Sequence, residues 1–219
     1  TDSPDAAMRL DDFVAKCRDN EIPCDMFHLS SGYSMSNDGM RYVFVWNRDR
    51  VPDPPAVART FRNAHMRVAA NIKPCLLTTH PEYEEAVKAG VFLCDKDGPH
   101  ITDFWGGKGS YIDFTSPRGY AWWKDHVRKS ILENGIDATW NDNNEYEIWD
   151  DSVLCEGFGR ETAISQIRPI QPLLMTRASW ESQREIRPEE RPFVLCRSGC
   201  PGIQRYAQSW SGDNYTSWD

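Results

Sequence analysis

The chain has 219 residues, and its 25 Lys and Arg residues against 33 Asp and Glu residues give a net charge of −8. This length can bury a sizeable core in one domain. The acidic balance, without a long run of basic residues, argues against nucleic acid as a partner. No segment approaches the ~18 consecutive apolar residues of a membrane span, and the N-terminus has no signal-peptide pattern, so we expect no membrane partner and a cytoplasmic location.

The seven cysteines and five histidines give no metal-binding pattern. An odd number of scattered cysteines in a chain of this size indicates reduced thiols. Cys196 and Cys200 form a C-x3-C pair, but no second pair or His cluster completes a zinc site. We therefore expect neither a metal nor another cofactor.

Helical and strand-like segments alternate in the first half of the chain. Residues 7–20 carry apolar side chains at helical spacing, and a short extended run follows at 24–29. Pro54 lies in the first turn of a second helix, and the apolar density of 66–72 suits a strand buried on both faces.

The second half of the chain repeats this alternation. Pro117 is typical of a helix start, and Gly135 is typical of a helix end. Further helices are predicted at 80–90, 117–134 and 160–187, and further strands at 136–140, 191–196 and around 205–210.

Helices that alternate with buried strands indicate parallel βα units, in either a doubly wound sheet or a (β/α)8 TIM barrel. Polar or small residues follow three of the strands directly, after Leu29, Trp140 and Cys196. The C-terminal strand ends of a barrel face one shared pocket, and the chain has none of the glycine-rich phosphate motifs of doubly wound sheets. The sequence therefore predicts an α/β fold of the TIM-barrel type.

If these strand ends converge, Asp142, Glu145, Arg197 and Asp213 belong to one site. Trp210 supplies an apolar platform of the kind on which sugar rings stack. Two carboxylates in an aromatic-lined pocket are the catalytic groups that hydrolysis of a glycosidic bond requires. A solvent-exposed turn is the alternative explanation for Asp142 and Glu145.

Four motifs resemble glycoside hydrolase family 31, which contains α-glucosidases, α-xylosidases and α-transglucosylases. They occur in the family's order, and the resemblance spans about residues 20–219. The motifs are W-G-G at 105–107 with Y-I-D-F-T-S-P at 111–117, W-N-D-N-N-E at 140–145, R-S at 197–198 with Q-R-Y at 204–206, and W-S-G-D-N at 210–214.

This resemblance implies a retaining mechanism. Asp142 would be the nucleophile that forms a covalent glycosyl-enzyme, and Asp213 would be the acid/base. Arg197 would hold a sugar hydroxyl or the second oxygen of the nucleophile. An acid that works near neutral pH must hold its proton, so we expect Asp213 to be partly buried beside Trp210.

The resemblance also implies a substrate pocket, for an oligosaccharide or α-glucoside with glucose as the first-choice sugar. Ser30 or Ser31 stands where many members carry an Asp that binds the glycone, and Asn143 stands where Met is common. The implied substrate-binding residues are Ser30, Trp105, Trp140, Asn143, Glu145, Arg197 and Trp210.

The matched region would supply about five of the eight barrel strands. We therefore expect residues 1–219 to form a partial TIM-barrel catalytic domain, with the remainder of the barrel as a partner. Transfer of the glucosyl group to another sugar instead of water is a second hypothesis, and a non-catalytic carbohydrate-binding fragment is a third.

Overall fold

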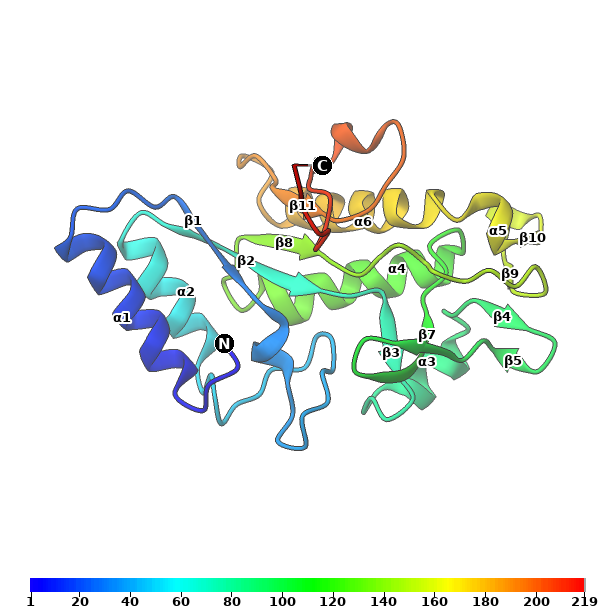
Figure 1. Ribbon diagram of the computed structural model, residues 1–219, viewed down its shortest axis with the longest axis horizontal. Helices are drawn as coiled ribbons and strands as arrows, with labels where there is room; N and C mark the ends of the chain where they lie inside the picture. The colour runs from blue at the N-terminus through cyan, green and yellow to red at the C-terminus, as the bar shows by residue number, and fades with distance from the viewer. Residues whose placement is uncertain (219) are drawn as a thin grey trace.

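A parallel sheet of five strands forms the centre of the computed structural model, which describes residues 1–218. The strand order is β1-β2-β8-β11-β12, and every neighbouring pair is parallel (Figure 1). This arrangement confirms the predicted α/β fold and is consistent with an incomplete TIM barrel. The strands are β1 (Met26–Leu29), β2 (Arg67–Ile72), β8 (Ala138–Asn141), β11 (Val194–Cys196) and β12 (Gln208–Ser209).

The helices follow the predicted pattern. Pro54 opens α2 behind an Asp53 cap, and Pro117 opens α4 behind a Ser116 cap, because proline tolerates the first helical turn. In Figure 1, α1 and α2 lie side by side at one end, and α4 and α6 lie together over the sheet. The helices are α1 (Ala6–Asp19), α2 (Pro54–Asn63), α3 (Tyr83–Ala89), α4 (Pro117–His126) with a π-helical continuation (Val127–Leu132), α5 (Ile164–Ile167) and α6 (Ile170–Ile186).

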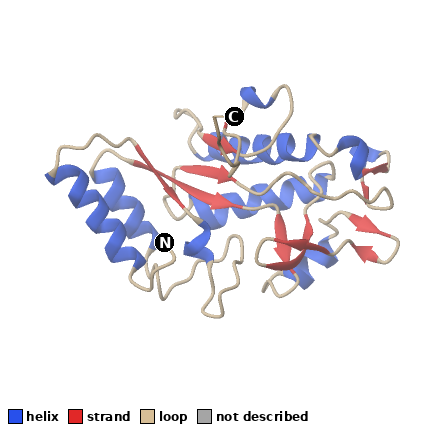
Figure 2. Ribbon diagram, in the orientation of Figure 1, coloured by secondary structure: helices blue, strands red, loops and turns tan. Residues whose placement is uncertain are grey.

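Two small antiparallel sheets were not predicted. They lie at the same end of the molecule, beyond the C-terminal ends of β2 and β8 (Figure 2). Their strands have two to five residues, too few for a clear alternation of apolar and polar side chains. One sheet contains β3 (Cys75–Leu77), β6 (Thr102–Phe104) and β7 (Gly107–Tyr111), and the other contains β4 (Cys94–Asp95), β5 (Gly98–Pro99), β9 (Leu154–Cys155) and β10 (Thr162–Ala163).

The core lies between the parallel sheet and the helices that cover it. Five consecutive residues of β2, from Val68 to Ile72, are buried, as expected for a strand covered on both faces. Trp123 of α4 is fully buried and donates its indole N–H to Ser179 Oγ at 3.0 Å. This bond ties α4 to α6 behind the sheet. Within residues 1–218, no helix is long and apolar enough to cross a membrane.

Candidate active site

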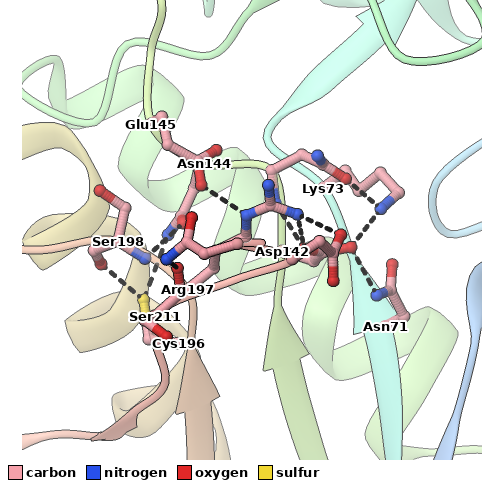
Figure 3. Close-up of polar contacts among 12 residues, drawn as sticks. Asn71, Lys73, Asp142, Asn144, Glu145, Cys196, Arg197, Ser198 and Ser211 are labelled. Carbon is pink, nitrogen blue, oxygen red and sulfur yellow. Dashed lines mark hydrogen bonds and ion pairs between the residues drawn. The ribbon is translucent and has the colours of Figure 1, made fainter. Parts of the chain in front are cut away.

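Asp142 follows the last residue of β8, and four donors surround its carboxylate (Figure 3). Oδ2 accepts hydrogen bonds from Asn71 Nδ2 at 2.9 Å and from Lys73 Nζ at 2.5 Å. Oδ1 accepts from the Asn143 backbone N–H at 2.9 Å and from Arg197 Nη1 at 3.4 Å. The side chain is therefore fixed from both sides at the C-terminal edge of the sheet.

The surroundings of Asp142 favour its ionised form. Burial alone would raise its pKa, but the Lys73 charge and the hydrogen bonds from Asn71 and Lys73 outweigh burial, so the pKa is lowered. Burial also lowers the pKa of Lys73, and the Asp142 charge opposes that effect. A buried carboxylate that stays ionised has the state that a nucleophile requires.

The turn after Asp142 is locked to the neighbouring strand. Asn143 and Tyr146 both have positive φ, at 47° and 54°, so the backbone reverses sharply here. Asn144 is fully buried, accepts a hydrogen bond from the Ser198 backbone N–H at 3.1 Å, and directs its Nδ2 to Cys196 Sγ at 3.2 Å. These contacts hold the loops after β8 and β11 together.

Arg197, the first residue after β11, connects three carboxylates. Its Nη1 lies 3.4 Å from Asp142 Oδ1 and 3.0 Å from Asp213 Oδ2, and its Nε lies 2.6 Å from Glu145 Oε1. Burial alone would lower the Arg197 pKa, but the charges of Glu145, Asp142 and Asp213 raise it overall. The four charged residues predicted to converge are therefore brought together by one guanidinium group.

The two candidate catalytic carboxylates lie close to each other. Because Asp142 and Asp213 contact the same Arg197 nitrogen, their nearest oxygens cannot lie farther apart than the sum of those two contact distances. That sum is below the ~6.5–9.5 Å that separates the carboxyl groups of inverting glycosidases.

The expected burial of Asp213 is wrong. Its side chain is 85% exposed and contacts Arg197. Gly212 has a φ of 84°, and the Asp213 carboxylate beyond it accepts a hydrogen bond from Arg197 Nη1 at 3.0 Å. Trp210 instead packs its ring against Trp140, with centroids 5.7 Å apart.

The other predicted substrate-binding residues lie around this centre. Trp105 is 48% exposed in the turn between β6 and β7. Its ring lies 4.4 Å from Arg41 Cζ and 5.1 Å from Lys73 Nζ. The Trp140 indole N–H is buried without a hydrogen-bond partner among residues 1–218. Ser30 follows β1 with its hydroxyl against Thr1 at 2.5 Å.

A small hollow of about 10 Å³ lies on the Lys73 side of Asp142, and it is too small as it stands to hold a sugar ring. It is lined by Ser31 rather than Ser30, together with Arg41, Asn71, Lys73 and Trp105. Sequence reasoning missed Arg41, Asn71 and Lys73. The sequence does contain a signal for Asn71 and Lys73. The segment A-A-N-I-K-P places these two polar residues at the end of an otherwise apolar strand, where burial would be costly without a partner.

A larger hollow of about 720 Å³ is not the reaction site. Its lining includes Cys24 and Met66, which precede β1 and β2, so it lies at the N-terminal ends of the strands. Active sites of TIM barrels lie at the opposite, C-terminal ends. No group of three His, Cys, Asp or Glu residues among 1–218 is arranged to hold a metal ion.

Residues 5–219 match the TIM-barrel domain of glycosyl hydrolases family 31. The chain belongs to glycoside hydrolase family 31. It is 27% identical to alpha-glucosidase 2 of Bacillus thermoamyloliquefaciens, over 92% of this chain and 26% of that protein. It is 30% identical to neutral alpha-glucosidase AB of Mus musculus, over 92% of this chain and 22% of that protein. The chain thus spans about a quarter of the length of these curated relatives.

Solved structures of this family share the fold. The Flavobacterium johnsoniae GH31 dextranase complexed with glucose superposes with a TM-score of 0.84 at 21% identity, over 95% of this chain and 26% of that chain. A GH31 alpha-xylosidase from a soil metagenome, complexed with xylose, gives a TM-score of 0.85 at 18% identity, over 97% and 31%. These matches confirm the predicted TIM-barrel fold.

Proposed function

We propose that the protein carrying this chain is a retaining α-glucosidase in which Asp142 is the nucleophile and Asp213 is the acid/base. The single observation that carries this proposal is the buried, ionised Asp142, which shares Arg197 with the nearby exposed carboxylate of Asp213. The two α-glucosidase relatives support an α-glucoside as the substrate.

In the first step, an Asp142 oxygen attacks the anomeric carbon of the glucosyl unit. The bond from that carbon to the leaving oxygen breaks, and Asp213 gives its proton to the leaving oxygen. The product is a glucosyl ester on Asp142. Lys73 and Asn71 hold the Oδ2 atom, and the Asn143 backbone N–H and Arg197 hold Oδ1, so both oxygens are oriented before the attack.

In the second step, Asp213 takes a proton from water, and the water oxygen attacks the same carbon. The ester bond to Asp142 breaks and the carboxylate returns to its ion pair with Lys73. Two displacements at one carbon retain its configuration. A sugar hydroxyl that replaces water in this step would give a transfer product, and product analysis at high acceptor concentration separates the two outcomes.

The test uses the intact natural protein that carries this sequence. A fluorinated α-glucosyl inactivator should label the peptide that contains Asp142, and NMR of early products should show the α-anomer. The variant Asp142→Ala should lose both labelling and turnover. Turnover at the wild-type rate in Asp142→Ala would refute the assignment of the nucleophile.

A further inference from the structure

Three arginines from different elements converge at the N-terminal ends of the parallel strands. Arg62 lies in the last turn of α2, Arg67 is the first residue of β2, and Arg187 follows α6. Their guanidinium groups meet at the carboxylate of Asp137, which directly precedes β8. Its Oδ1 lies 3.0 Å from Arg62 Nη2, 2.9 Å from Arg67 Nη1 and 3.6 Å from Arg187 Nη1. The parallel pairing of β2 with β8 explains this convergence, because it brings the starts of the two strands side by side.

The positive charge of this cluster exceeds the charge of its acidic partners. Among residues 1–218, the other carboxylate that contacts the three arginines belongs to Glu190, whose Oε2 lies 3.1 Å from Arg67 Nη1. Three guanidinium groups therefore face two carboxylates, which leaves one positive charge in excess. Burial lowers the pKa of Arg187, the two carboxylates oppose this effect, and the two neighbouring arginines add to it. A further anion beside the guanidinium groups would reduce their mutual repulsion.

The cluster opens onto a hollow that can hold such an anion. The arginine hollow has a volume of about 460 Å³ and is lined by Arg62, His65, Met66, Arg67, Arg187 and Glu190. Within the described part of the chain, the hydrogen bonds of Arg62 use Nη2 and those of Arg67 use Nη1. Because a guanidinium group has five N–H donors, both residues keep donors for a ligand. Their side chains are 49% and 45% exposed, so a ligand can reach these donors from solvent.

The arginine hollow adjoins the larger hollow of about 720 Å³ between the ends of α1 and α2. His65 and Met66 line both of them. A ligand whose anionic group contacts the arginines therefore has room for an attached organic group. Both hollows lie at the N-terminal ends of the strands, whereas Asp142 follows the C-terminal end of β8. A ligand bound here would not occupy the place of the substrate.

We propose that the arginine hollow binds a phosphate group, either as free phosphate or as a phosphate monoester. Phosphate oxygens match the fork of N–H groups on a guanidinium, and the negative charge offsets the excess positive charge of the cluster. A bound phosphate would connect α2, β2 and the segment after α6, so it should stabilise the folded protein. This site is separate from the catalytic function proposed above and does not rest on it.

The test measures binding of inorganic phosphate and of glycerol phosphate to the intact natural protein by calorimetry at low salt, where screening is weak. We expect phosphate to bind to the wild type, and Arg67→Gln to weaken its binding about tenfold, as for loss of one charge-assisted contact. Glu190→Gln should tighten binding instead, because it removes a negative charge from the hollow. A misfolded variant would not produce such a gain.

The two probes distinguish the two sources of the phosphate group. Binding of glycerol phosphate that is as tight as or tighter than that of inorganic phosphate would identify a phosphate monoester as the ligand. Weaker binding of glycerol phosphate would identify the free ion. Either result supports a phosphate site, since both require the arginines.

Arg177→Gln is the matched control. Arg177 pairs with Glu181 within α6 and its side chain is 49% exposed, but it does not line the arginine hollow. This variant should bind phosphate like the wild type. Thermal unfolding with and without phosphate gives an independent readout, because a ligand of the folded state raises stability. Absence of phosphate binding in the wild type, equal losses in Arg67→Gln and Arg177→Gln, or weaker binding in Glu190→Gln would overturn the proposal.

Discussion

Lys73 Nζ lies 2.5 Å from Asp142 Oδ2, and each of these side chains is about nine-tenths buried. The pairing follows from the sheet, because Ile72 of β2 is in register with Asn141 of β8. The residues that follow these two strand ends are therefore neighbours. The parallel register thus supplies a fixed positive charge to the candidate nucleophile.

Replacing Lys73 by Met should shift the acidic limb of the kcat/KM profile to higher pH. In the wild type the Lys73 charge outweighs burial and lowers the Asp142 pKa, so the carboxylate stays ionised to a lower pH. Without that charge, burial raises the pKa, and protonation removes the nucleophile at a higher pH. At a pH below the limb, moving the limb up by about one pH unit lowers kcat/KM about tenfold.

Lys73→Arg is the control for this experiment, because it keeps the positive charge and should keep the acidic limb close to that of the wild type. Acidic limbs that coincide in Lys73→Met and wild type would contradict the role of Lys73 as a positioning residue for Asp142.

The close approach of Gly212 to Arg197 gives a second prediction. A Cβ at position 212 would lie 2.9 Å from Arg197 Nε, so Gly212→Ala should displace the guanidinium and weaken its contacts with Asp142 and Asp213. We expect kcat to fall by roughly tenfold to a hundredfold, as when a positioning group moves by a fraction of an ångström. Steady-state kinetics would measure this.

Gly159→Ala separates the steric effect from backbone strain. Gly159 has a φ of 92°, similar to the 84° of Gly212, but a Cβ there meets no described atom within 4 Å. Both substitutions carry the strain of a left-handed alanine. Equal losses of kcat in the two variants would show that displacement of Arg197 is not the cause.

The alternation of helix and strand, and the convergence of four charged residues, could be predicted from the sequence. Helix starts at Pro54 and Pro117 have local signals, and Asp142 and Arg197 directly follow strands whose C-terminal ends share one edge. The substrate-binding roles of the predicted residues remain predictions. The cytoplasmic location also remains a prediction.

The remaining features depend on information that no local pattern carries. The exposure of Asp213 follows from no pattern in the sequence around it, and the pairing of Lys73 with Asp142 depends on the register of two strands about 70 residues apart. The strands of the small antiparallel sheets are too short for a periodic signal. Tertiary structure therefore determines the pairing of Lys73 with Asp142.

Asp137 gives a prediction about stability rather than turnover. Its side chain is 5% exposed, and it accepts hydrogen bonds from Arg62 at 3.0 Å, Arg67 at 2.9 Å and the Val68 backbone N–H at 3.0 Å. Asp137→Ala leaves a buried backbone donor and two guanidinium groups without this acceptor. The free energy of unfolding should fall by about 2 kcal/mol. Chemical denaturation, with a signal that reports on the unfolding of this domain, would measure the change.

Asp12→Ala serves as the stability control, because Asp12 forms an exposed ion pair with Lys16 within one helix. Removal of such a pair should change the free energy of unfolding by less than about 0.5 kcal/mol. A loss for Asp137→Ala that is no larger than this would contradict the role given to the Asp137 cluster.

Substitution of Asp213 tests whether this residue is the acid that protonates the leaving group. If Asp213 protonates the leaving oxygen, Asp213→Asn should lower kcat/KM by about 10²–10⁴-fold for an oligosaccharide, whose alkoxide is a poor leaving group. The first step on α-glucosyl fluoride should be much less affected, because fluoride leaves without a proton. Asp97→Asn, at an exposed turn residue, should leave both substrates unchanged. Equal losses on the oligosaccharide and the fluoride in Asp213→Asn would instead assign Asp213 to holding Arg197, which it contacts at 3.0 Å.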